Sequence, residues 1–310
     1  MPTEPLRTVL YSELSKIQAT EFLIDVSPLL TELINNGTHV LIRCADSASS
    51  DKDVDLAPLS IYKHILEMAD AFATLIAAGI STPTIPLLRS MFEALLSLEF
   101  VCENKEKYNR RSLQWLSSHV RNKSRVYQTL LIGTDRYKEF KAMIKKDKSI
   151  QSWPVFPQDE LKKHIVNLEE LQKKDHFIEI QDEYKRLEDT GIKNPHWYSL
   201  FSGPRSMEEL ANEMNRPVQY NVLYRQWSKF SHAQDFSNFL QRTPTGKPGI
   251  KGMRDAGQLI TFSRFAIVFS WEATAQILKH FRASENPNTY YEKEIRPRFV
   301  KIMNIDKGTN

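Results

Sequence analysis

The chain has 310 residues, 41% hydrophobic and 26% charged, which is enough apolar material for one large or two modest domains with a buried core. Its 10 glycines supply few of the tight turns of a many-stranded β fold, and its 2 cysteines are too few for a disulfide scaffold. The net charge of +4 is uneven, since residues 105–148 hold 13 basic and 4 acidic side chains.

Apolar positions recur every three or four residues along most of the chain, which predicts an all-α helical bundle. The first helix is expected to start near Val9 and to end at Asn35-Asn36-Gly37. Residues 39–44 form the single segment with strand character, and 45–57 and 243–249 are expected to be loops. Further helices are expected at about 60–78, from 86, 105–131, from 206, 219–240 and 255–281.

These elements suggest a division of the chain along its length. Residues 1–57 would form an N-terminal helix and acidic linker, 58–285 the bundle domain, and 286–310 a basic C-terminal tail. Within the bundle, residues 134–190 are highly charged, and we expect them to form an inserted helical arm. No apolar run reaches the roughly 18 residues of a membrane span, and the first residues lack a secretory signal, so a cytoplasmic protein without membrane contact is expected.

One predicted helix, around residues 219–240, has an unusual polar face. Arg225 and His232 are seven residues apart and would lie within about 20° of each other on a regular helix. Tyr224 and Ser228 share that side, whereas the opposite side is expected to be core, with Leu223, Trp227 and Phe230. Histidine is a natural general acid or base near neutral pH, and arginine suits a phosphate through its two-pronged guanidinium.

A second polar pair lies on the most apolar helix. Arg89 and Glu93 are four residues apart and therefore neighbours on one face. They could be a structural ion pair that fixes the register of the helix. Alternatively, they could face the helix of His232 and form one polar pocket with it.

The basic helix at 105–131 supplies candidate RNA contacts, namely Arg110, Arg111, Arg121, Lys123 and Arg125. A merely solvated helix face would have the same composition. The histidines and cysteines have no metal-ligand spacing, so neither a metal nor another cofactor is expected.

The segment Leu87-Leu88-Arg89-Ser90-x-x-Glu93, together with Tyr224-Arg225-x-x-Ser228-x-x-x-His232, resembles an uncharacterised bacterial all-helical family that is similar to the HEPN superfamily. The resemblance spans roughly residues 59–281 without the charged arm. It implies a HEPN-like fold and a ribonuclease that works without metal. In such an enzyme His232 would act on the ribose 2′-hydroxyl or the leaving oxygen, and Arg225 would hold the scissile phosphate.

The resemblance also implies a homodimer and a role as a toxin or antiviral defence effector, with Arg89, Glu93, Tyr224 and Ser228 in support of catalysis. The alternative is a non-catalytic binding or sensor module of a defence or toxin–antitoxin system. In that case the polar pocket binds a small ligand or only fixes the core, and the arm at residues 134–189 contacts a protein partner or antitoxin.

Overall fold

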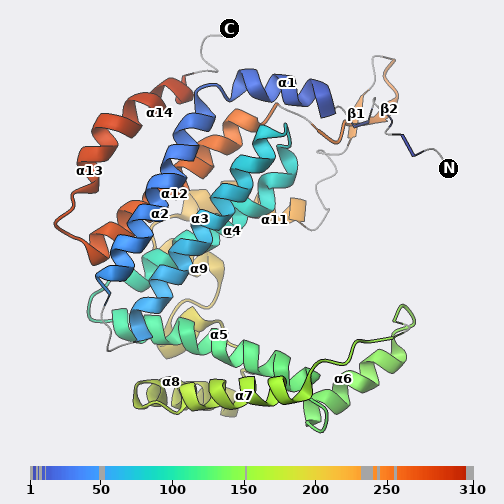
Figure 1. The fold of residues 1–310 in the computed structure, drawn as a ribbon, viewed down its shortest axis with the longest axis vertical. Helices are drawn as coiled ribbons and strands as arrows, with labels where there is room; N and C mark the ends of the chain where they lie inside the picture. The colour runs from blue at the N-terminus through green and yellow to red at the C-terminus, as the bar shows by residue number, and fades with distance from the viewer. Residues whose placement is uncertain are drawn as a thin grey trace. The chain divides into compact units, whose positions relative to one another are not determined.

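A computed structural model of the protein describes residues 3–4, 6, 9–10, 12–48, 53–150, 152–231, 240–242, 245–254 and 257–304. Over these residues the chain is all-α except for two three-residue strands (Figure 1). It divides into two compact units. Unit 1 comprises residues 1–104 and 207–310, and unit 2 comprises residues 105–206.

The centre of unit 1 is a group of long helices that pack side by side: α2 (Val26–Asp46), α3 (Leu56–Ala77), α4 (Ile85–Cys102) and α12 (Leu259–Phe281) (Figure 1). Their facing side chains, including Phe72, Phe92 and Phe269, are fully buried. The short helix α1 (Ser12–Phe22) packs on α3 and α12. The predicted helical bundle is therefore confirmed for this part of the chain.

The expected end of the first helix at Gly37 is wrong, as is the strand at 39–44. The chain turns earlier, at residues 23–25, and α2 then runs unbroken through Gly37 to Asp46. A Cβ at Gly37 would lie 2.5 Å from Leu66 Cδ2 and 3.1 Å from the hydroxyl of Tyr62, both on α3. The glycine therefore permits two helices to approach closely, and it does not end one.

The expected helix at 219–240 begins slightly earlier than predicted and is less regular over its described residues. It begins with α10 (Pro217–Gln219), passes through a π-helical turn, η4 (Tyr220–Tyr224), and continues as α11 (Arg225–Ser231), which packs on α4. Residues 232–239 lie outside the described part of the chain, and Leu240 already belongs to a strand. That strand, β1 (Leu240–Arg242), pairs antiparallel with β2 (Pro248–Ile250).

Unit 1 also contains the short helix α9 (Met207–Glu213) and a helical segment near the end of the described chain. Helix α9 contacts α4. Residues 287–303 belong to the segment that was predicted from composition to be a basic tail. They form α13 (Pro287–Tyr290), a second π-helical turn, η6 (Tyr291–Ile295), and α14 (Arg296–Met303). Ile295 and Ile302 are buried, and Arg298 pairs with Glu32 of α2, so this segment is part of the fold.

Unit 2 contains the basic helix α5 (Tyr108–Leu130), against which α6 (Asp135–Lys146), α7 (Gln158–Gln172), α8 (Asp175–Asp189) and the 3₁₀ segment η3 (Trp197–Ser202) pack. The charged arm is thus helical, as expected. None of the helices in the described ranges of either unit is long and apolar enough to cross a membrane.

Candidate functional site

Arg89 on α4 connects the two motifs of the sequence. Its Nε donates to Glu93 Oε1 at 2.9 Å, and its Nη2 donates to the hydroxyl of Tyr224 at 2.9 Å. A longer contact of 3.5 Å joins Nη1 to Ser228 Oγ. The guanidinium also lies over the ring of Tyr224, 4.9 Å from its centroid. Arg89 and Glu93 therefore face the helix that carries Tyr224 and Ser228, as the second of the two sequence interpretations expected.

An aromatic cluster beneath this network fixes the two helices against α12. Phe92 lies between Tyr224, with ring centroids 6.1 Å apart, and Phe269, at 5.7 Å. Trp227 is 5% exposed and packs edge-on against Phe265 and Phe269, as expected of a core residue. Leu223 and Phe230, also predicted to be core, are only half-buried. The polar network thus sits at the edge of the hydrophobic core.

Burial and charge set the protonation of the network. Burial raises the pKa of Tyr224 to about 12, and the carboxylate of Glu93 adds to the effect. The phenol is therefore protonated at neutral pH, so it can donate to Glu93 while it accepts from Arg89. Burial is the largest single influence and would lower the pKa of Arg89, but the hydrogen bond and charge of Glu93, together with the contact to Tyr224, outweigh it and raise the pKa above its ordinary value. Arg89 therefore stays a cation and Tyr224 a neutral phenol across the physiological pH range.

The π-helical turn decides where the polar residues of the second motif point. It ends at Tyr224, so that Tyr224 and Ser228 face Arg89, whereas Arg225 is exposed and donates to Asn221 Oδ1 at 3.3 Å. Turns of this kind are rare and occur frequently at functional sites. His232 follows α11 directly and lies outside the described residues, so its distance to Arg225 is not defined.

Ser90, the remaining polar residue of the first motif, has a different partner. Its hydroxyl lies 2.8 Å from Nε2 of His64 on α3. The motif on α4 therefore points in two directions, with Arg89 and Glu93 toward α11 and Ser90 toward α3.

A second charged cluster, which sequence reasoning missed, lies further along α4. Arg216 donates from Nε to Glu99 Oε2 at 2.7 Å and makes a second bond to the same carboxylate. Its Nη1 lies 2.9 Å from Glu272 Oε2 on α12. Burial raises the pKa of Glu272, and Arg216 opposes this. The Arg216 side chain is 14% exposed, so the cluster ties three segments together at the margin of the core.

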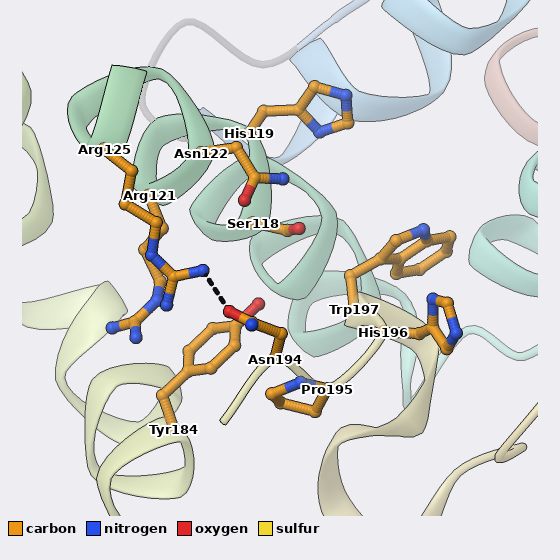
Figure 2. A pocket seen from close by; sticks show the side chains of 10 residues that line it. All are labelled: Ser118, His119, Arg121, Asn122, Arg125, Tyr184, Asn194, Pro195, His196 and Trp197. Atoms are coloured by element: carbon orange, nitrogen blue, oxygen red, sulfur yellow. Dashed lines mark hydrogen bonds between the residues drawn. The ribbon is translucent and has the colours of Figure 1, made fainter. Parts of the chain in front are cut away.

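The five candidate RNA contacts do not share one surface. Arg111 is buried, Lys123 is exposed, and Arg110 pairs with Glu179 at 3.8 Å and stacks over Phe201. Arg121 and Arg125, one turn apart on α5, line the same hollow (Figure 2). This basic hollow, with a volume of about 350 Å³, is bounded by α5, α8 and residues 194–197.

Sequence reasoning missed the other walls of the basic hollow. Asn194, His196 and Trp197 line the hollow opposite α5. A second hollow, which includes Arg186 and Arg205, shares the residues 194–196 with it. The clustering of Asn194-Pro195-His196-Trp197 in sequence was the available signal. Across the part of the chain that the structure describes, no three histidine, cysteine or acidic side chains are grouped so that they could hold a metal.

The described chain is therefore an all-α protein with a polar network between α4 and α11 and a separate basic hollow in unit 2. A family model described as a family of unknown function (DUF5677) matches residues 55–248, and the chain belongs to this family. The match covers both sequence motifs and the basic hollow but establishes no link to the HEPN superfamily. No curated protein and no solved structure matches the chain.

Proposed function

We propose that the protein is a metal-independent endoribonuclease in which Arg225 and His232 act on the RNA backbone. The observation that carries this proposal is the pair of contacts from Arg89 to Tyr224 and Ser228. These contacts orient the helix that exposes Arg225 and leads at Ser231 into His232. Sites built on helices held by such supporting contacts keep reactive groups in place.

The chemistry would run in one displacement. His232, as the neutral imidazole, would accept the proton of a ribose 2′-hydroxyl while that oxygen attacks the adjacent phosphorus. The bond from phosphorus to the 5′-oxygen breaks, and the leaving oxygen takes a proton from the imidazolium or from water. The products are a 2′,3′-cyclic phosphate and a 5′-hydroxyl. Arg225 would hold the non-bridging oxygens through its guanidinium fork.

The wider role rests on the resemblance of the two motifs to HEPN proteins. A toxin or antiviral defence effector that acts as a homodimer would place two copies of the Arg225 helix around one RNA strand. Val218 and Val222, on the turns next to Arg225, are 70% and 60% exposed, which suits a helix that meets a second copy. The site would then be complete only in the dimer.

A second candidate is a non-catalytic binding or sensor module. The observation in its favour is that Arg89 donates to Glu93, Ser228 and Tyr224, which all belong to the network itself. Such contacts also suit a purely structural role, in which they fix the packing of α11 on α4. This reading predicts that substitution of His232 leaves cell growth and RNA unchanged.

The test is incubation of the purified protein with total cellular RNA at neutral pH in the presence of EDTA. We expect cleavage by the wild type, 2′,3′-cyclic phosphate ends, and no cleavage by His232→Ala. The matched control is His39→Ala, which removes an exposed histidine of α2 and should cleave like the wild type. Cleavage that EDTA abolishes, or that survives in His232→Ala, would reject the proposal.

A further inference from the structure

Unit 2 contains a site that the proposed catalytic network does not use. The basic hollow has a volume of about 350 Å³ and lies wholly within unit 2. Small-molecule sites have volumes of roughly 300–1,000 Å³ and present a few fixed polar groups beside apolar or aromatic walls. The basic hollow has both features, which Figure 2 shows on opposite sides.

One side of the basic hollow carries more positive than negative charge. Arg121 and Arg125 share the single carboxylate of Glu188, with N···O distances of 2.6 Å and 3.8 Å. The two side chains are 20% and 29% exposed, so water screens their charge incompletely. Burial, followed by repulsion from Arg121 and Arg136, lowers the pKa of Arg125. An anion placed beside Arg125 would relieve this repulsion.

The two guanidinium groups are held in place before any ligand arrives. Arg125 Nη1 donates to Asn194 Oδ1 at 2.6 Å, the contact drawn in Figure 2. Arg121 stacks on the buried ring of Tyr184, 4.1 Å from its centroid, and donates to Gln181 at 3.2 Å. An arginine that is already oriented loses little conformational entropy when it binds a phosphate.

The other side of the basic hollow is aromatic. In Figure 2 the rings of Trp197 and His196 lie across the hollow from the guanidinium groups, with Asn122 between the two sides. His196 is exposed and stacks on Tyr198 with an interplanar angle of 8°, so its ring is held against a firm support. Aromatic faces of this kind stack with nucleobases, and amide side chains recognise base edges.

We propose that the basic hollow binds one nucleotide unit, with its phosphate beside Arg125 and Arg121 and its base against Trp197 and His196. The unit can be a free nucleotide or one residue of a single-stranded RNA, because both present the same phosphate and base. The site stands on residues of unit 2 alone and does not depend on the activity proposed for Arg225 and His232.

The test is titration of the full-length protein with AMP, inorganic phosphate and a five-nucleotide single-stranded RNA, followed by calorimetry and by tryptophan fluorescence. We expect AMP and the RNA to compete for the same site and to bind more tightly than inorganic phosphate. Arg125→Gln should weaken AMP binding by about tenfold or more. Trp197→Leu should weaken AMP binding but leave the binding of inorganic phosphate unchanged.

The matched control is Lys163→Gln, which removes one exposed positive charge from α7 of the same unit, outside the basic hollow, and should change AMP affinity by less than about twofold. Thermal melting of each variant checks that unit 2 remains folded. The two sources of the ligand are distinguished by whether AMP or the RNA binds more tightly. Three results would overturn the proposal: no binding of AMP and RNA up to about 1 mM, equal affinity for AMP and phosphate, or equal losses in Lys163→Gln and Arg125→Gln.

Discussion

Arg89 and Tyr224 are joined by a 2.9 Å hydrogen bond from a guanidinium nitrogen to a phenol oxygen, across the contact between α4 and the π-helical turn. They are 135 residues apart in sequence. Because Tyr224 precedes Arg225 directly, this bond determines which side of the helix faces the core and which side faces solvent. The placement of the candidate catalytic arginine therefore depends on a residue that does not contact it.

The coupling between these two residues can be measured. A double-mutant cycle of Arg89→Met and Tyr224→Phe should give a coupling of about 1 kcal/mol in the free energy of unfolding, measured by urea denaturation. The matched control is the cycle of Lys63→Ala and Glu67→Ala, an ion pair on α3 whose side chains are 59% and 53% exposed. This control cycle should give a coupling of less than about 0.5 kcal/mol in the free energy of unfolding. Equal couplings in the two cycles would mean that Arg89 does not fix the turn.

Arg216 should be among the most sensitive positions of unit 1. Replacement by Met leaves Glu99 and Glu272 close together near the core without their cation, so we expect a loss of about 3 kcal/mol in the free energy of unfolding. Arg298→Met removes an arginine from the more exposed pair with Glu32 and should cost about 1 kcal/mol or less. A loss at Arg216 as small as that at Arg298 would contradict the role of the cluster.

Unit 2 should lose stability in acid through Glu183. This buried carboxylate accepts from Arg186 and from the backbone N–H of Phe201 at 2.9 Å. The bond to Arg186, and then that to Phe201, hold the pKa of Glu183 below its ordinary value of 4.5, although burial opposes them. The stabilisation is therefore present above that value and is lost as the pH falls through the lower folded pKa.

The comparison is urea denaturation of wild type and Glu183→Gln between about pH 3 and pH 7. The wild type should lose stability steeply at the acid end, and the variant should show a flatter curve with lower stability at neutral pH. Glu179→Gln, at a side chain that is 64% exposed, should follow the wild type. The role of Glu183 is refuted if its variant has the same acid slope as the wild type.

Both cysteines should be unreactive in the folded protein. Burial raises the pKa of Cys44 to about 11 and that of Cys102 to about 12, so neither forms a thiolate at neutral pH. Iodoacetamide followed by intact mass measurement should show no adduct on the native protein and two on the protein unfolded in urea. Rapid labelling of either cysteine without denaturant would show that the helix around it opens readily.

The helical class of the protein followed from periodicity alone, because long amphipathic segments such as 105–131 have a strong repeat. Gly37 was misread, because sequence alone does not distinguish a glycine that ends a helix from one that lies against Leu66 of another helix. The sequence left open whether Arg89 and Glu93 pair only with each other or also face the helix of Tyr224, and it did not identify Tyr224 as the partner of Arg89. The π-helical turn was not predicted, because a change from α to π geometry depends on packing and leaves no mark in the hydrophobic pattern.

Only part of the lining of the basic hollow could be predicted from the sequence. Arg121 and Arg125 were recognised from composition, but Asn194 and Trp197 were not, because they lie 69 or more residues further along the chain and meet α5 only in the folded unit. Composition also grouped Arg111 with these two arginines, although Arg111 is buried. Charge along a helix shows where cations lie in sequence and leaves open which of them share a surface.

The most direct test of the central claim is the rate of cleavage of one defined single-stranded RNA, in EDTA, by wild type and His232→Ala. Both proteins should first be shown to be folded by circular dichroism. We expect the wild type to cleave the RNA to a 2′,3′-cyclic phosphate product, and the variant to cleave it about 10²–10⁴-fold more slowly. Equal rates in the two proteins, or no cleavage by either of them, would contradict the claim that His232 and Arg225 form a ribonuclease site.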